Sequence, residues 1–357
     1  MKKTLLAAAL TVGFFGVAQA ETSVTLYGII DTGLGYNKTE VGDVDATKFG
    51  MINGVQSGSR WGLKGTEDLG DGLQAVFQLE SGFDSSTGKS AQGSRLFGRH
   101  ATIGLQSDSW GRLDFGRQTN IASKYMDIAS PFGASFGQAN VGATFGSANT
   151  TRWDNMVMYQ TPNFSGFQFG VGYSFNVDGA QNWDVDGKPD SNEEGITAGL
   201  RYVNGPIGAA LTYDQIKNET ADEKVKQWNL GLSYDFEVVK LHAGFGQTRD
   251  GWINAYGFGG NAPDFATVNI YNDNLDANLY TFGVSAPVGA GTVMASWAMV
   301  DFDEDFSDEK QSIYSLGYTY ALSKRTNVYA YGSYADNVWG VEDAKSTAIG
   351  VGIRHQF

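Results

Sequence analysis

The sequence contains no cysteine among its 357 residues, and it has only six prolines and three histidines. Without cysteine, neither disulfides nor thiolate metal ligands can hold the fold together. The histidines, His100, His242 and His355, are scattered and follow no metal-ligand spacing. The sequence therefore predicts neither a metal site nor a cofactor.

Long hydrophobic runs are absent after the first twenty residues. A membrane-crossing helix needs about 20 consecutive apolar residues, so a helical membrane protein is excluded. The one apolar run, from Leu5 to Val17, is too short to be such an anchor; it follows two lysines and precedes Ala18-Gln19-Ala20. This pattern predicts a secretory signal peptide over residues 1–20, cut before Glu21, and a mature domain over residues 21–357.

Basic residues are also scarce. The sequence has 25 Lys and Arg and 39 Asp and Glu, which give a formal net charge of −14. Nucleic-acid binding needs a basic footprint and is not expected. Serines and carboxylates are plentiful, but no nucleophile, base and orienting group can be picked out as a set. The sequence predicts a protein that is not an enzyme, with an outer-membrane lipase or protease as a distant alternative.

Glycine and aromatic residues are abundant, with 48 glycines and 13% aromatics. In "WNLGLSYDF", residues 228–236, large apolar side chains alternate with Asn229, Gly231, Ser233 and Asp235. Eight residue steps span about 26 Å, or about 20 Å across a membrane at a strand tilt near 40°. The polar faces hold glycine and serine rather than the lysine and glutamate of a soluble surface, so we expect the large side chains to face lipid.

The same alternation recurs along the whole chain. It predicts about sixteen strands, over residues 23–36, 57–67, 71–84, 94–106, 109–118, 152–161, 164–176, 194–204, 206–216, 226–236, 238–248, 276–287, 290–301, 310–322, 325–336 and 346–357. Tight turns alternate with long polar loops, as in transmembrane barrels, and lipid demands a closed sheet. We therefore expect an all-β fold, a 16-stranded antiparallel transmembrane β-barrel whose last strand, ending at Phe357, pairs with the first.

Several segments resemble the Gram-negative general diffusion porins, most closely their beta-proteobacterial branch. They include "VTLYGIIDTGLGY", "SRWGLKGTEDLGDGLQAVFQLESGF", "WGRLDFGRQ", "YALSKRTNVYAYGSYAD" and the closing "VGIRHQF". The resemblance covers nearly the whole mature chain. It implies a homotrimer in the outer membrane, with lipid and lipopolysaccharide around it. It also implies passive flow of small hydrophilic solutes and ions, and recognition of Phe357 by the barrel-assembly machinery.

Residues 119–151 form a long stretch without strong periodicity, which is expected only of a functional loop. In the porins that it resembles, the third external loop folds inward and narrows the pore. Pro131-Phe132-Gly133 resembles the loop-tip motif of that family, although the acidic residue common in the motif is missing. Lys124 and Asp127 are the only charges of the loop, and Asp127 is expected on the acidic side of the constriction.

The resemblance also implies a basic arc on the wall opposite the loop, at Arg60, Arg99 and Arg152. Alternation with apolar neighbours supports an inward position for Arg60 and Arg152. Lys64 and Arg95 share the registers of Arg60 and Arg99 and are expected to point inward too. Alternation places Arg112 and Asp114 on an inner face, and Glu80 lies on the inner face of its strand, where it could pair with Arg99. Arg117 has the wrong parity unless Gly116 forms a bulge, and it is ranked lower.

Clustered arginines at a narrow point raise the local anion concentration and repel cations. We therefore expect mild anion preference despite the acidic total charge, because many acids, as in "DFDEDFSDEK", belong to external loops. The closest alternative is a substrate-specific channel for organic acids or phosphate. A structural or adhesive barrel with a plugged lumen is a third class, against which the glycine-rich inner faces count.

Overall fold

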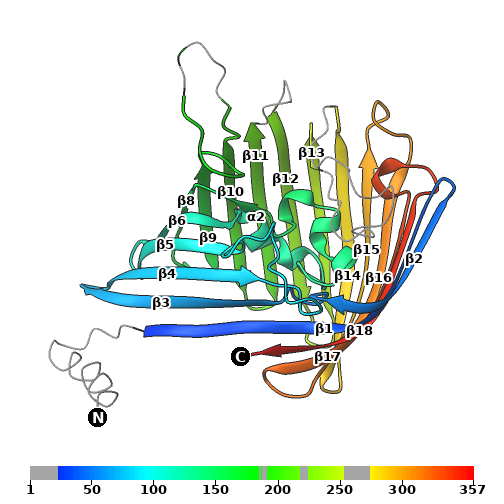
Figure 1. Cartoon of the computed structure of the whole chain (residues 1–357), viewed down its shortest axis with the longest axis horizontal. Coiled ribbons are helices and arrows are strands. Elements are labelled where there is room, and N and C mark those ends of the chain that lie inside the picture. Colours follow the sequence, from blue (N-terminus) through cyan, green and yellow to red (C-terminus); the bar gives the residue numbers. More distant parts are fainter. Residues whose placement is uncertain (1–22, 185, 187–190, 218–223, 253–273) are drawn as a thin grey trace.

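The computed structural model describes residues 23–184, 186, 191–217, 224–252 and 274–357; the expected signal peptide lies outside them. In this part of the chain, strands form one closed antiparallel sheet (Figure 1). Their bounds are β1 Ser23–Val41, β2 Val44–Asn53, β3 Arg60–Gly70, β4 Leu73–Gly82, β5 His100–Ser107, β6 Gly111–Thr119, β7 Arg152–Trp153, β8 Met156–Gln160, β9 Phe167–Ser174, β10 Gly195–Asn204, β11 Ile207–Lys217, β12 Lys224–Asp235, β13 Lys240–Arg249, β14 Ala277–Val288, β15 Gly291–Phe302, β16 Lys310–Ala321, β17 Thr326–Asp336 and β18 Lys345–Gln356.

Two barrel strands are interrupted, which reconciles these eighteen segments with a 16-stranded barrel. Both β2 and β3 pair with β1, and both β7 and β8 pair with β6. Each of these pairs of segments therefore occupies one position in the ring. The predicted fold class is confirmed.

The ring closes between its first and last strands. β1 and β18 pair from Ile29↔Gln356 to Glu40↔Lys345. Beyond them, the backbone N–H groups of Gly28 and Phe357 each donate to the other residue's carbonyl over 3.1 Å. The predicted pairing of the C-terminal strand with the first is confirmed, and the strands that the structure describes have no open sheet edge between them.

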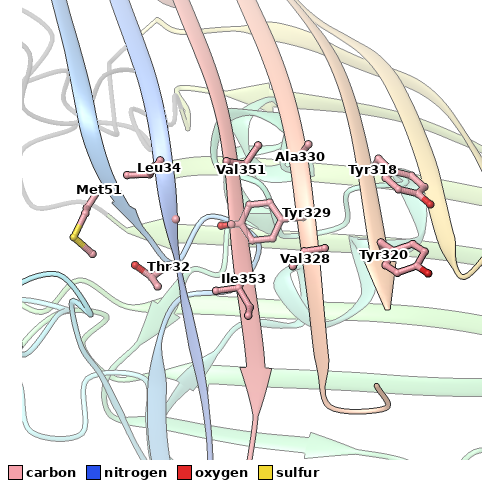
Figure 2. Close-up of a pocket in the computed structure, with 12 residues that line it drawn as sticks. Thr32, Leu34, Met51, Tyr318, Tyr320, Val328, Tyr329, Ala330, Val351 and Ile353 are labelled. Carbon is pink, nitrogen blue, oxygen red and sulfur yellow. The ribbon is translucent and has the colours of Figure 1, made fainter. Parts of the chain in front are cut away.

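The two faces of the sheet are inverted relative to a soluble protein. On β12 the outward Leu232 and Tyr234 are 46% and 43% exposed, whereas the inward Asn229 is fully buried. The outer wall at β18 likewise presents Val351 and Ile353 (Figure 2). Among the described residues, no helix is both long and apolar enough to cross a membrane. The alternation read from the sequence therefore has its large apolar side outward, as predicted.

Connections alternate in length, with two departures from prediction. Turns at 71–72, 205–206 and 289–290 are short, and the connections 83–99, 120–151 and 175–194 are long. However, residues 44–53, expected in a loop, form β2 and return along β1 through a two-residue turn. The strand expected over residues 94–106 begins only at His100, so Arg95 and Arg99 precede it.

Residues 120–151, called the inner segment below, pack on the inner faces of β9 to β17. They contain α2 (Ile121–Tyr125) and the short 3-10 helices η1 (Met126–Ala129), η2 (Gly137–Ala139), η3 (Val141–Ala143) and η4 (Gly146–Ala148). Figure 1 shows α2 and the turns that follow it in front of the strands from β10 to β14. η5 (Val338–Gly340) lies outside this segment, before β18.

Inward glycines make room for the inner segment. A Cβ atom added at Gly231 would lie 3.1 Å from the Cβ of Ala129, and one added at Gly283 would collide with the ring of Pro131. The same holds along the wall at Gly170, Gly199, Gly244 and Gly317, which face Ile121, Ala129, Phe145 or Phe132. These glycines face a packed segment, which explains why the inner faces are so poor in side chains.

Polar side chains of the wall fix the segment at its start and near its middle. Asn120 donates from Nδ2 to Asp214 Oδ1 over 2.8 Å, and Thr197 Oγ1 accepts from the backbone N–H of Ile121 over 2.8 Å. Near the middle, Gln138 accepts a hydrogen bond from the hydroxyl of Ser346 (2.8 Å) and donates one to the carbonyl of Ser346 (3.2 Å). The inner segment is therefore a fixed part of the barrel interior.

Candidate functional site

The strands that the inner segment leaves uncovered carry a cluster of arginines and acids. Glu80 on β4 is its centre, because its Oε1 accepts from Arg99 Nε at 2.6 Å and lies 3.9 Å from Arg60 Nη1. Both Glu80 and Arg99 are buried. The structure thus brings Arg60 and Arg99 together and forms the predicted Glu80–Arg99 pair.

Arg152 on β7 completes the basic arc of Arg60, Arg99 and Arg152. Its guanidinium experiences the positive charges of Arg99, Arg117 and Arg60 and the negative charge of Glu80. Its Nε is buried without a hydrogen-bond partner among the described residues.

Arg354 on β18 extends the arc and was not among the predicted site residues. Its charge acts on Arg60, and it pairs in register with Asp31 on β1. Asp31 is fully buried and accepts a hydrogen bond from the Tyr329 hydroxyl over 2.7 Å. The signal was present in the sequence, because Arg354 follows Gly350 and Gly352 on the small-residue face of the closing strand.

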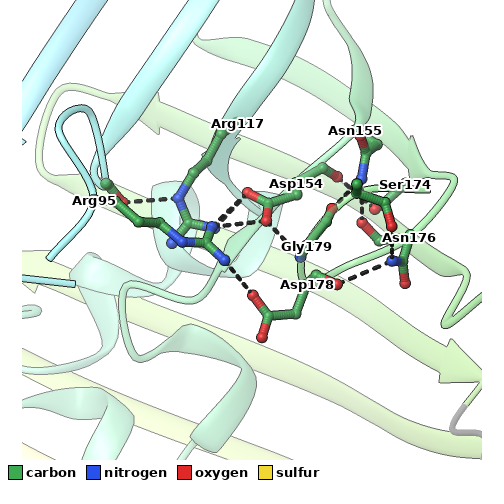
Figure 3. Close-up of polar contacts among 10 residues, drawn as sticks. Arg95, Arg117, Asp154, Asn155, Ser174, Asn176, Asp178 and Gly179 are labelled. Atoms are coloured by element: carbon green, nitrogen blue, oxygen red, sulfur yellow. Dashed lines mark hydrogen bonds and ion pairs between the residues drawn. The ribbon is translucent and has the colours of Figure 1, made fainter. Parts of the chain in front are cut away.

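A second ionic cluster joins three connections between strands (Figure 3). Asp154, between β7 and β8, accepts from Arg95 Nη1 at 2.7 Å and from Arg117 Nη1 at 2.7 Å. Arg95 also reaches Asp178 at 2.6 Å, and the N–H of Gly179 donates to Asp154 over 2.8 Å. Arg95 is therefore held in a loop, where strand alternation has no bearing on its direction.

Arg117 belongs to the site, although its parity argued against it. Gly116 has a φ of 114°, and the pairings Phe115↔Val157 and Gln118↔Trp153 differ in register by one residue. The distortion lets Arg117 donate to Asp154 and to the carbonyl of Gly98, over 2.8 Å for the latter. Asp154 itself was missed by the sequence reasoning, because nothing local marks it as the shared acceptor.

The remaining predicted charges line the wall on the short-turn side of the arc. Lys64 Nζ lies 5.4 Å from the ring centroid of Tyr27, whose hydroxyl donates to Glu80 over 2.8 Å. Arg112 Nε pairs with Asp114 over 2.6 Å. Burial lowers the pKa of Lys124, in the inner segment, to about 8; the Asp114 charge opposes this shift and the Arg112 charge adds to it.

Asp127 and the loop tip lie elsewhere in the barrel. Asp127 Oδ1 is 3.8 Å from Arg201 Nη2, in a hollow of about 370 Å³ that also contains Lys240 and His242. Pro131 and Gly133 line the same hollow, and the buried Phe132 packs edge-on to Phe136 at 5.5 Å. The carboxylates placed among the arginines are thus Glu80, Asp31 and Asp154, whereas the nearest cation to Asp127 is Arg201.

The described residues hold no group of three or more His, Asp or Glu side chains arranged for a metal ion. The arrangement has a net positive charge and lies next to a fixed inner segment. It contains five arginines and three carboxylates: Arg60, Arg99, Arg117, Arg152 and Arg354, with Glu80, Asp31 and Asp154. Such a surface concentrates anions and repels cations.

Comparison with known proteins gives concordant results. The model of the Gram-negative porin family matches residues 6–338. An outer membrane porin protein of Bordetella pertussis is 58% identical over 388 aligned residues, covering 100% of both chains. Outer membrane porin protein 32 of Delftia acidovorans is 35% identical, also over 100% of both chains. The solved structure of an anion-selective porin from Comamonas acidovorans has a TM-score of 0.75 and 30% identity, and covers 94% of this chain and 100% of its own.

Proposed function

Since the chain belongs to the Gram-negative porin family, and is thus a channel protein of the outer membrane and not an enzyme, we propose that it passes small anions by diffusion. The proposed path runs between the inner segment and the basic arc of Arg60, Arg99 and Arg152. Small hydrophilic solutes would follow the same path, with cations disfavoured.

The observation that carries this proposal is the imbalance of charge at the arc. Arg60 and Arg99 share one carboxylate, Glu80, and Arg152 experiences three like charges. Only Lys124 and Asp127 are charged in the inner segment, so it offers the arc little compensation. A water-filled passage lined by arginines has a positive electrostatic potential. This potential attracts mobile anions into the passage and repels cations.

The porin from Comamonas acidovorans, described as anion-selective, supports the same assignment. Its likeness extends over 94% of this chain, and the match therefore includes strands that carry the arc. The selectivity of that protein depends on its own charged residues. Anion selectivity of this chain must therefore be tested on its own arginines.

Planar-bilayer recordings test the proposal directly. The reversal potential across a KCl gradient would be measured for the wild type and for Arg60→Ser, Arg99→Ser and Arg152→Ser. Removing one unit charge about 8 Å from the ion path in water is worth about 0.5 kcal/mol, and we expect each variant to lose about half of the anion preference. Lys89→Ser, at an exposed loop position, is the control. If none of the three substitutions changed the reversal potential, the arc would not determine selectivity. If the wild type formed no channels, the proposed conduction would be wrong.

A substrate-specific channel for organic acids or phosphate is the second candidate. It is favoured by the grouping of Arg60 and Arg99 around the single carboxylate of Glu80, because such a basic site can bind the carboxylate or phosphate group of a solute. Flux measured in liposomes separates the two: saturation at rising solute concentration indicates a specific channel, and flux set by size and charge alone indicates a general one.

Assembly as a homotrimer stays a prediction from the porin resemblance, together with contacts to lipopolysaccharide and recognition of Phe357 by the assembly machinery. Phe357 is 44% exposed at the end of β18. Mass determination of the detergent-extracted protein tests the oligomer. The yield of folded protein from Phe357→Ala tests the assembly role.

A further inference from the structure

The outer wall carries an apolar groove of about 720 Å³ across β16, β17, β18, β1 and β2 (Figure 2). Its rims are Tyr318 and Tyr320 on one side and Leu34 and Met51 on the other. Figure 2 shows Ala330 and Val328 between the tyrosines and the Val351–Ile353 strand. This inference rests on the place of the barrel in the outer membrane and is independent of conduction.

The groove exists because β17 turns small residues outward where its neighbours turn large ones. Ala330 pairs in register with Tyr318 on β16 and with Val351 on β18. Two residues further, Gly332 has open space outside it, since an added Cβ would meet only Ile349 Cγ1 at 4.0 Å. A trough with a floor of small residues and apolar rims fits an acyl chain, which gains contact area there over a smooth wall.

Cations stand at the end of the groove nearest the β16–β17 turn. Lys324 and Arg325 lie in this turn, both exposed. His355 faces outward two residues beyond Ile353, about 7 Å along the strand, with Nδ1 2.8 Å from Thr326 Oγ1.

These cations have no acidic partner nearby. No acidic residue occurs between Lys310 and Asp336, nor in β18. Within the part of the chain that the structure describes, neither Lys324 nor Arg325 has an ion pair. The end of the groove therefore carries two exposed cations, Lys324 and Arg325, that no Asp or Glu side chain neutralises.

We propose that this groove binds an anionic phospholipid. An acyl chain would lie over Ala330 and Gly332, and the phosphate would meet Lys324 and Arg325. The order of features along the wall, an apolar trough followed within a few residues by unpaired cations, matches the order of acyl chain and headgroup in the lipid. A second protein copy would cover the apolar part, but it offers no reason for two unpaired cations at one end.

Native mass spectrometry of the folded protein in a neutral detergent tests the proposal. Bound lipid would be counted during titration with dioleoyl-phosphatidylglycerol or with dioleoyl-phosphatidylcholine, which has the same chains and no net charge. We expect tighter binding of phosphatidylglycerol. In the double variant Lys324→Gln/Arg325→Gln this preference should fall by about fivefold for each cation removed.

Substitutions that fill the groove test binding of the acyl chain separately from binding of the phosphate. Ala330→Phe should reduce binding of both lipids, and Thr32→Leu, which fills the same groove from β1, provides a second variant if the first misfolds. Lys89→Gln/Lys224→Gln, at two exposed cations on elements that do not line the groove, should bind lipid as the wild type does.

Three results would overturn the proposal. Equal binding of the two lipids would remove the role of the cations, and unchanged binding in both filled variants would place the lipid elsewhere. A change of oligomer mass in a filled variant, with lipid binding unaltered, would assign the groove to a second copy of the chain.

Discussion

Arg99 donates from Nε to Oε1 of Glu80 over 2.6 Å, and both side chains are buried on the inner wall. The pair places one negative charge at the centre of the arc, where Arg60 also approaches it. Glu80 therefore both positions the arginines and reduces their field. These two roles lead to opposite effects when the carboxylate is removed.

Glu80→Gln should raise the anion preference of the channel. The amide keeps the shape of the side chain but removes its charge, so the positive potential of Arg60 and Arg99 is no longer offset. The reversal potential in a KCl gradient is the measurement. Glu67→Gln, which neutralises an exposed carboxylate of β3, is the matched control and should change selectivity less. A fall in anion preference would show that positioning dominates.

Selectivity should also depend on pH through Lys124. Burial lowers the pKa of this ammonium to about 8, so the side chain is charged below that pH and neutral above it. Anion preference should therefore decline as the pH rises from 7 to 9. Reversal potentials recorded across this range, for the wild type and for Lys124→Gln, check the assignment.

The variant should start at a lower anion preference and lose the step near pH 8. An unchanged step in Lys124→Gln would mean that another group titrates in this range.

Arg354→Ser should weaken anion preference about as much as each substitution in the arc. Its charge acts on Arg60, and its Nε donates to Ser57 over 2.8 Å, so it stands with the arc. Lys345→Ser on the same strand is the control, because Lys345 pairs with the exposed Asp343 over 3.0 Å. Equal reversal potentials for the two variants would separate Arg354 from the ion path.

Gly283→Ala should destabilise the inner segment. The new methyl group would collide with the rigid ring of Pro131, and overpacking of this kind costs about 1–3 kcal/mol. Gly332→Ala adds the same methyl group on the outer face of β17, where the nearest atom would be 4.0 Å away. We expect a lower unfolding temperature and noisier single-channel current for Gly283→Ala alone. Equal behaviour of the two alanine variants would show that the segment moves aside without cost.

The strand pattern was predictable because a membrane barrel imposes a strict two-residue alternation and closure. That is why the ring of sixteen, the outward apolar face of β12 and the pairing of β18 with β1 follow from the sequence. β2 was missed because Asp45, Thr47 and Lys48 give it little apolar alternation. Its place is fixed by pairing with β1.

The site was predictable only in part, for a related reason. Arg60, Arg99 and Arg152 were expected from the resemblance to the porins, and alternation supported Arg60 and Arg152. The pairing of Glu80 with Arg99 was expected because Glu80 lies on the inner face of its strand. Arg117 depends on a distorted glycine, and Asp154 on contacts between loops far apart in sequence, neither of which periodicity can reveal. The role of the inward glycines was hidden as well, because their partners lie in the inner segment.

The ionic cluster at Asp154 leads to a prediction about the long connections. Its carboxylate accepts from Arg95, Arg117 and the N–H of Gly179, and so ties the connection 83–99 to the connection that follows β9. Asp154→Asn would leave the guanidinium of Arg117 with a neutral partner and that of Arg95 with only the exposed Asp178, which weakens the charge-assisted hydrogen bonds of the cluster. We expect faster amide hydrogen exchange in residues 83–99 and 175–184, measured by mass spectrometry. Asp178→Asn, at a side chain that is 77% exposed, should change exchange far less, because solvent already screens its pair with Arg95. Similar protection in both variants would mean that backbone contacts alone order these connections.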